Sequence, residues 1–270
     1  MGHPLDGVRE KITRAEAHLA TVTAEIKSHK NKCTVIARKQ ADRDAVFDLY
    51  ASFPDPSSTL SCFISDCLNN VRTALDYIVH ELATKHGEAV IHNMFPISNT
   101  SDGFKRQVEE RDRLHHVPGK ARAIIESLQP YNGVRVNRFW HPLYVLNRLT
   151  NTDKTHLLPL TVACAPRPTF VLNDSHGPMR IDGLSITKAF QNGARIVDQR
   201  ITEIQADEVS LSIEEGLYVA FKDVPWAEFP AETVLSNIVQ FIKSDVVPKF
   251  DPFFDKGSKQ LVQSHAGEVR

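Results

Sequence analysis

Two stretches of the chain carry apolar residues at the spacing of an amphipathic α-helix. From Leu5 to Lys30 the apolar positions are separated by alternating steps of three and four residues, which places them on one face of a helix. The pattern from Ser58 to His86 is stronger, and Gly87 follows as a suitable C-terminal cap residue. At about 1.5 Å per residue the second helix would extend about 40 Å. We therefore expect the two helices to form an antiparallel pair.

Between these helices the pattern changes to loose alternation. Apolar residues in Cys33–Arg38 and in Ala45–Phe53 fall on one face of an extended chain. The stretch Lys39–Asp44 between them is polar. These features predict two strands joined by a hairpin turn.

The last hundred residues are rich in β-prone segments. Glu208–Ile213 and Leu217–Phe221 flank Glu214-Glu215-Gly216, a pattern that predicts a β-hairpin with its turn at the glycine. Pro166 and Pro168 interrupt an earlier β-prone stretch, which we expect to form two short segments. Shorter strands are expected near Met179–Ile181 and Arg195–Ile204.

Further helices are predicted on both sides of the strand-rich region. Short helices are expected near Ser101–Arg111 and Gly119–Leu128. Pro142 suits the first turn of another helix, which we expect to give way to a polar turn around Asn151–His156. An amphipathic helix, about 230–248, closes the fold.

Helices that come first, strands that cluster later and the absence of βαβ alternation indicate an α+β fold. We expect a long antiparallel helical pair with additional helices, and an antiparallel sheet formed mainly by the C-terminal half. The prediction is a single domain over residues 1–256, with a helical part to about 156 and a strand-rich part over about 157–225. Residues 257–270 are polar and are predicted to be a disordered tail.

Composition narrows the class of protein. Hydrophobic residues make up 41% and charged residues 24% of the chain, and 32 Lys and Arg against 33 Asp and Glu leave a formal net charge of −1. No global field therefore attracts nucleic acid or an anionic membrane. The N-terminus lacks the features of a secretory signal, and no run approaches the roughly 20 apolar residues that span a bilayer. We expect a soluble cytoplasmic protein with no membrane partner.

No cofactor or metal site is predicted from sequence motifs. Glycine-rich phosphate loops do not occur, and Cys62 and Cys67 have neither Cys-x-x-Cys spacing nor nearby ligands that would complete a zinc site. The four cysteines are expected to be reduced and mostly buried.

The first candidate site is a polar stripe on the predicted helix 58–86. Asn69, Arg72, Asp76 and His80 fall on one arc of that helix, with Arg72 and Asp76 closest to its apolar face. One interpretation is an Arg72–Asp76 ion pair that fixes the helix register. The other is an Arg–Asp–His constellation that faces a cleft. An ordinary solvated face is a third.

The second candidate site is a polar cluster at the end of the helix that begins at Pro142. It contains Arg148, Asn151, Asp153, Lys154 and His156. Asp can orient a histidine, lysine can hold an anion, and histidine can transfer protons. The same residue types also cap helices and form turns. We expect this cluster to meet the first one at a helix interface.

Two smaller features lie beside the second cluster. Arg135 and Arg138, together with Arg148 and Lys154, could form an anion-binding patch, although a solvated face is the interpretation that we favour. The pair Phe139-Trp140 precedes the helix, where aromatic residues are more typical of a core than of a ligand pocket.

Three segments resemble a set of uncharacterised bacterial proteins. They are Asn70–Asp76 (NVRTALD), Gln129–Tyr131 (QPY) and Leu146–His156 (LNRLTNTDKTH), and the resemblance covers roughly residues 60–160. Those proteins share an Asn-x-Arg-x-Ala-Leu-Asp helix and an Asn-x-Asp-Lys-His turn. Here Thr155 is inserted before the histidine. The resemblance implies candidate positions and no particular chemistry.

The chain also has a distant similarity to HEPN domains, helical bundles that often carry a ribonuclease Arg-x(4–6)-His motif. Arg72 and His80, like Arg148 and His156, are separated by seven residues. Eight helical steps cover about 12 Å, against about 7.5–10.5 Å for the HEPN spacing. Contact with one phosphate from a single helix is therefore less easy, and two helices or a homodimer could restore it. The late strands also depart from a helical bundle.

The sequence leaves two hypotheses of function. The favoured one is a binding or interaction protein with a polar site between helices. The alternative implied by the HEPN similarity is metal-independent RNA cleavage, with His80 or His156 as general base and Arg72 or Arg148 holding the phosphate. RNA is a partner only under this alternative.

Overall fold

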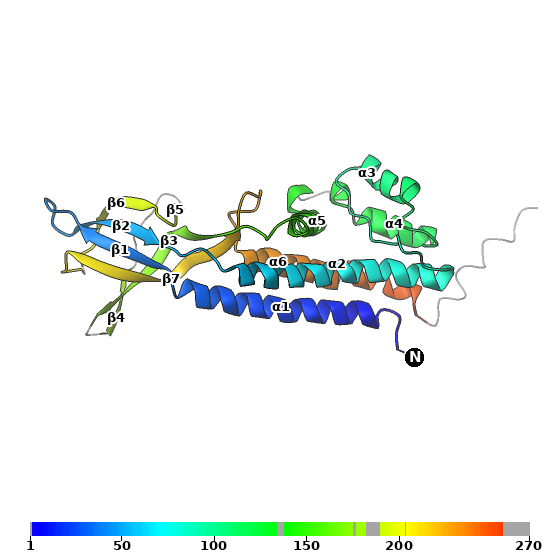
Figure 1. Cartoon of the computed structure of the whole chain (residues 1–270), viewed down its shortest axis with the longest axis horizontal. Helices are drawn as coiled ribbons and strands as arrows, with labels where there is room; N and C mark the ends of the chain where they lie inside the picture. The colour runs from blue at the N-terminus through cyan, green and yellow to red at the C-terminus, as the bar shows by residue number, and fades with distance from the viewer. Residues whose placement is uncertain (1, 134–137, 175–176, 182–189, 203, 256–270) are drawn as a thin grey trace, which may run out of the picture. The chain divides into compact units, whose positions relative to one another are not determined.

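The computed structural model describes residues 2–133, 138–174, 177–181, 190–202 and 204–255 of the 270-residue chain (Figure 1). The chain divides into two compact units. The helical unit combines Met1–Leu19, Ile64–His156 and Val234–Arg270, and the sheet unit combines Ala20–Phe63 and Leu157–Thr233. The predicted single domain over 1–256 stays a prediction. The predicted tail at 257–270 lies outside the described residues.

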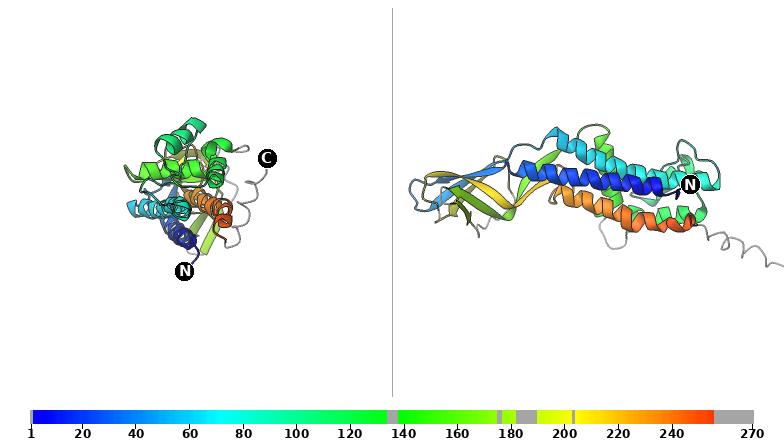
Figure 2. Two further views of the ribbon diagram at one scale, coloured as in Figure 1. Left: turned by 90° about the vertical axis from the view of Figure 1, so that its right-hand side faces the viewer. Right: turned by 90° about the horizontal axis from the view of Figure 1, so that it is seen from below.

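Two long helices, α1 (Asp6–Lys30) and α2 (Ser58–His86), contribute to the helical unit together with the shorter α6 (Ala231–Phe241). Their parts in this unit lie side by side (Figures 1 and 2). The Cys67 thiol donates to the carbonyl of Ala15 over 3.4 Å, whereas Lys11 lies over the Tyr77 ring, so α1 and α2 run antiparallel as predicted.

The apolar faces of these helices form the core of the helical unit. Because the spacing of three and four residues keeps these side chains on one face, each helix buries a continuous stripe. The fully or almost fully buried members include Val8, Ile12, Ala15, Leu68, Val71, Leu75, Ile78, Leu82, Leu235, Ile238 and Val239. Beyond α6 the chain continues as a π-helical turn (Ile242–Val246) and short 3₁₀ turns at Val247–Lys249 and Asp251–Phe253.

Further helices follow α2 in the sequence. They are α3 (Ser101–Lys105), the π-helical turn η1 (Arg106–Glu110), α4 (Gly119–Ser127), 3₁₀ turns at Pro130–Asn132 and Arg138–Trp140, and α5 (Pro142–Asp153). These elements match the predicted short helices. The helix α5 has Pro142 in its first turn and ends at Asp153, and a turn follows, so the expected change from helix to polar turn around Asn151–His156 is confirmed.

The strands of the sheet unit form one antiparallel sheet. They are β1 (Thr34–Lys39), β2 (Val46–Ser52), β3 (Leu160–Asp174), β4 (Gly177–Ile181), β5 (Phe190–Gln191), β6 (Arg195–Arg200) and β7 (Glu208–Phe221). Their order is β4-β3-β7-β1-β2-β6, and β5 also pairs with β3. The predicted β1–β2 hairpin is confirmed, and so are the α+β class and the concentration of strands in the C-terminal half.

The predicted hairpin at Glu214-Glu215-Gly216 is wrong, since β7 runs continuously through it. Gly216 has φ +93, a value that glycine adopts freely and that here forms an irregularity within the strand rather than a turn. The residues of β7 on both sides of Gly216 pair with β3, and the register shifts between Cys164 and Thr169. β3 is also one strand rather than the two expected segments. Pro166 and Pro168 lie within the register shift, where the strand tolerates residues that have no backbone N–H to donate.

Among the described residues no helix combines the length and the hydropathy that crossing a bilayer requires.

Candidate functional site

The Arg72–Asp76 pair on α2 holds a neighbouring backbone segment. Arg72 Nη2 donates to Asp76 Oδ1 over 2.9 Å and to the Phe95 carbonyl over 2.6 Å. The Phe95 amide donates to the same Asp76 oxygen over 2.8 Å. The predicted ion pair is therefore confirmed, and it also satisfies both backbone groups of Phe95.

Burial perturbs both charges of this pair. The Arg72 and Asp76 side chains expose 18% and 24% of their surface. Burial lowers the pKa of Arg72, and the Asp76 carboxylate opposes that change. Burial likewise raises the pKa of Asp76, against the effects of Arg72, the Phe95 amide and Arg113. Each charge is stabilised by the other, as a partly buried ion pair requires.

Asp153 and Asn69 join α5 to α2. The Ser65 hydroxyl donates to Asp153 Oδ1, and Asn69 Nδ2 donates to Asp153 Oδ2 over 3.4 Å. The two polar clusters predicted from the sequence therefore meet across this helix interface. The side chains of Asp153 and Asn69 are hydrogen-bonded in that contact, and neither residue lines the two pockets described next.

The first pocket, here called the basic pocket, lies where α2, α5 and the residues between them come together. It is a cavity of about 260 Å³, and its lining residues are Arg72, Met94, Ile97, Gln107, Arg111, Arg113, Asn147, Thr150, Asn151 and Lys154. Among these described lining residues four side chains are cationic and none is acidic. A cavity with this lining attracts an anion.

The loop after η1 places two of the four cations. Asp112 has φ +47, a left-handed conformation that costs a non-glycine residue about 1–2 kcal/mol. The Arg113 amide donates to the Gln107 carbonyl over 3.1 Å, and the Met94 amide donates to the Arg113 carbonyl over 3.1 Å. Asn93 Nδ2 also donates to the Arg113 carbonyl, over 3.4 Å. The loop is thus fixed by its backbone, and the arginines at its ends line the cavity.

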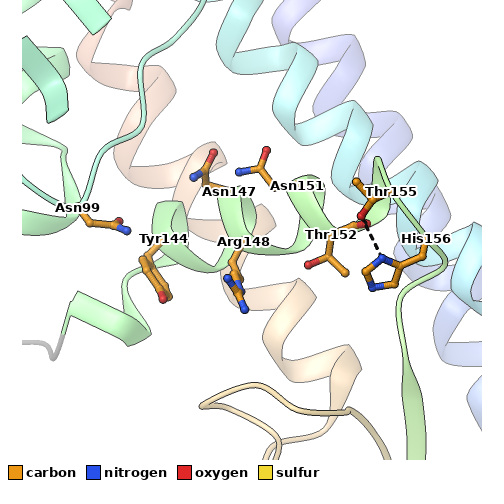
Figure 3. Close-up of a pocket in the computed structure, with 8 residues that line it drawn as sticks. All are labelled: Asn99, Tyr144, Asn147, Arg148, Asn151, Thr152, Thr155 and His156. Atoms are coloured by element: carbon orange, nitrogen blue, oxygen red, sulfur yellow. Dashed lines mark hydrogen bonds between the residues drawn. The ribbon is translucent and has the colours of Figure 1, made fainter. Parts of the chain in front are cut away.

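The second pocket, here called the α5 pocket, adjoins the basic pocket. It is a cavity of about 340 Å³ lined by Asn99, Tyr144, Asn147, Arg148, Asn151, Thr152, Thr155 and His156 (Figure 3). Asn147 and Asn151 line both pockets. In Figure 3 these two asparagines project from one side of α5, and Tyr144 and Arg148 project from the other.

His156 belongs to the α5 pocket, whereas His80 does not. The His156 ring is 3.0 Å from the Thr155 hydroxyl and shares the pocket with Arg148. His80 lines a different cavity of about 410 Å³ with Asp76, Tyr77, Glu81 and Asn93. The structure therefore brings Arg148 and His156 into one pocket and places Arg72 and His80 in separate cavities.

Several lining residues were missed by sequence reasoning. They are Asn99, Gln107, Arg111, Arg113, Tyr144 and Asn147. Asn147 lies one helical turn before Asn151, so a helical wheel of α5 would have found it. No local pattern links Arg111 and Arg113 to α2, because only the fold brings them together.

The aromatic pair Phe139-Trp140 and the basic residues around α5 do not lie as expected. Phe139 and Trp140 expose 37% and 36% of their surface, so the prediction that they belong to the core is wrong. The basic patch that is the less favoured interpretation of these residues is divided, because Arg148 lines the α5 pocket and Lys154 lines the basic pocket. Arg135 and the side chain of Arg138 lie outside the described part of the structure.

The cysteines do not contribute to the pockets. Cys33, Cys67 and Cys164 are buried and Cys62 is exposed, all as free thiols. Burial raises the pKa of Cys67 and of Cys164 to about 12, which disfavours the nucleophilic thiolate. Within the described ranges, no group of three or more His, Cys, Asp or Glu side chains is placed to hold a metal ion.

Comparisons with protein-family models, with curated proteins and with solved structures found no match.

Proposed function

We propose that this protein binds a small anionic ligand in the basic pocket. The observation that carries the proposal is the imbalance of charge in its lining. Arg72 is paired with Asp76. Among the described residues, no carboxylate lies within ion-pair distance of Arg111, Arg113 or Lys154, which line the same cavity.

Converging cations repel one another, so a pocket of this kind is stabilised when an anion enters it. Arginine matches the geometry of phosphate and carboxylate because its planar guanidinium can donate two parallel hydrogen bonds. Lys154 would add a point charge, and the Asn147 and Asn151 amides would supply neutral donors. The sequence favoured a binding protein with a polar site between helices, and this proposal specifies that the ligand of that site is an anion.

Calorimetric titration of the full chain with inorganic pyrophosphate tests this proposal. The double variant Arg111→Gln/Lys154→Gln removes two pocket cations whose side chains are exposed. We expect it to weaken binding at least tenfold, about 1.4 kcal/mol. The matched control Lys105→Gln/Lys120→Gln removes two exposed cations outside the pockets and should bind like the wild type. Wild-type protein that binds no pyrophosphate would refute the proposal.

Metal-independent RNA cleavage is the second candidate, favoured by the shared position of Arg148 and His156 in the α5 pocket. His156 would take the proton of a ribose 2′-hydroxyl, whose oxygen then attacks the adjacent phosphorus and displaces the 5′-oxygen of the next nucleotide. Arg148 would stabilise the charge on the phosphate, and solvent would protonate the leaving oxygen. We expect the same proton transfer to be absent at His80, because that side chain lines another cavity.

Incubation of the pure protein with single-stranded RNA in the presence of a chelator tests this candidate. Cleavage should be abolished in His156→Ala and in Arg148→Ala while thermal unfolding is unchanged. His80→Ala is the matched control and should cleave normally. Absence of cleavage by the wild-type protein removes the candidate. A cytoplasmic location and a homodimeric state are further expectations, which fractionation and light scattering can test.

A further inference from the structure

We infer that the basic pocket and the α5 pocket together form one site for a nucleoside phosphate, with the phosphates in the basic pocket and the base in the α5 pocket. This inference rests on the proposed anion-binding function. Its first support is continuity, because the Asn147 and Asn151 side chains line both cavities.

The sizes of the two cavities support a shared ligand. The basic pocket, at about 260 Å³, lies below the range of about 300–1,000 Å³ that is usual for small-molecule sites. It is large enough for a phosphate group and too small for most metabolites. The α5 pocket adds about 340 Å³, which brings the combined space well within that range.

The chemistry of the α5 pocket differs from that of its neighbour. Three of its described lining residues are asparagines, at positions 99, 147 and 151, and these described residues include one arginine and no carboxylate. An asparagine amide offers a donor and an acceptor side by side, which is the pattern that recognises the edge of a base such as adenine. A lining of amides thus suits a neutral heterocycle with hydrogen-bonding edges.

Tyr144 and Arg148 supply flat surfaces in the same pocket. They are one helical turn apart and project from the same side of α5 (Figure 3). The Phe139 ring packs edge-on against Tyr144, with 5.4 Å between ring centroids. This contact fixes the orientation of the Tyr144 ring. Aromatic rings and arginine planes are the surfaces on which proteins stack unpaired bases.

The two ends of the combined site therefore differ in charge. Three cations of the basic pocket have no carboxylate within ion-pair distance in the part of the chain that the structure describes, and the described lining of the α5 pocket is largely neutral and polar. A ligand with several negative charges at one end and a planar neutral group at the other matches this division. A nucleoside diphosphate has that form, and its diphosphate carries more charge than a single phosphate.

Calorimetric titration of the full chain with ADP, pyrophosphate and adenosine tests the inference. We expect ADP to bind at least tenfold more tightly than either of its parts, because one site receives both halves. Tyr144→Ala should weaken ADP binding about tenfold, since it removes the stacking surface, and should leave pyrophosphate binding unchanged. Tyr144→Phe retains the ring and should bind ADP like the wild type. Arg111→Gln/Lys154→Gln should weaken both ligands.

The outcomes separate this inference from the function on which it rests. If pyrophosphate and ADP bind equally tightly, or if Tyr144→Ala weakens both to the same extent, the nucleotide site is refuted and the anion site stands. If ribose 5-phosphate binds as tightly as ADP, the base has no site and the inference again fails. Binding of single-stranded RNA without binding of ADP also overturns it. If none of these ligands binds, both proposals fail.

Discussion

Two groups of charged residues at the basic pocket differ in whether the fold supplies their ion-pair partners. Arg72 and Asp76 are half-buried, and their charged atoms bind each other and both backbone groups of Phe95. Arg111 and Lys154 are exposed at the same cavity without a carboxylate partner among the described residues. A charge with all its partners within the fold contributes to architecture, whereas converging charges of one sign indicate that the partner comes from outside.

The first prediction removes one partner of the satisfied group. Asp76→Ala removes the acceptor of the Phe95 amide and the carboxylate that pairs with Arg72, which keeps only the Phe95 carbonyl as its acceptor. We expect the free energy of unfolding to fall by about 2–3 kcal/mol, less than for a fully buried pair because both side chains are partly exposed. Denaturant titration measures this loss. Asp76→Asn keeps an acceptor for the Phe95 amide and should lose less, and a change below about 0.5 kcal/mol in Asp76→Ala would contradict the architectural role.

The second prediction concerns the contact between α5 and α2. Asp153→Ala removes the acceptor for Ser65 and Asn69 and should cost about 1–2 kcal/mol of unfolding free energy. Asn69→Ala should cost less, because its hydrogen bond is long at 3.4 Å. Thermal unfolding of both variants tests the order. An Asn69→Ala variant that is less stable than Asp153→Ala would contradict this account.

The third prediction concerns the start of α5, the helix on which both pockets depend. The neutral His141 ring accepts from the Leu143 amide over 3.3 Å, and burial lowers the pKa of His141 below its usual 6.5. The unfolded chain therefore takes up the proton first. The stabilisation is complete above about pH 6.5 and is lost as the pH falls from there through the lower pKa of the folded state.

The variant His141→Ala checks this cap. It should lose about 1 kcal/mol at pH 8, the usual contribution of an N-terminal cap. The difference from the wild type should shrink as the pH falls below about 6.5. Unfolding free energies measured by denaturant titration between pH 8 and pH 5 give this profile. A difference that grows on acidification would have the wrong sign for this mechanism.

The smallest predicted effect concerns Lys154, one of the pocket cations without a carboxylate partner among the described residues. Lys154→Gln removes a pocket cation, and we expect the protein without ligand to keep its stability or to gain a few tenths of a kcal/mol, about 0.2–0.5, from reduced repulsion. Thermal unfolding in low salt measures the change. A loss above about 1 kcal/mol would mean that Lys154 has a structural partner and would remove it from the proposed site.

Much of the fold could be predicted because it depends on local periodicity. The boundaries of α2 follow from its long apolar stripe and the glycine at position 87, and α5 begins where Pro142 indicates. The error at Gly216 has a physical cause, because a glycine with positive φ is compatible with a hairpin turn and with an irregularity inside a strand. Only pairing with β3 distinguishes the two.

The site could be predicted only in part for a related reason. Arg72 and Asp76 are four residues apart on one helix, so their pairing is visible in the sequence. Arg111 and Arg113 follow a π-helical turn in a loop that is held by Asn93 and Met94. Their approach to α2 depends on tertiary contacts that no spacing encodes. Sequence reasoning consequently found the ion pair and missed two of the three pocket cations that have no carboxylate within ion-pair distance among the described residues.

The most direct test measures thermal unfolding with and without pyrophosphate in the wild type, Asp76→Asn and Arg111→Gln/Lys154→Gln. Asp76→Asn should unfold at a lower temperature than the wild type and keep the ligand-induced rise. Arg111→Gln/Lys154→Gln should unfold at the wild-type temperature without ligand and lose that rise. A wild type that pyrophosphate does not stabilise, or an equal rise in Arg111→Gln/Lys154→Gln, would contradict the division between architectural and ligand-binding charges.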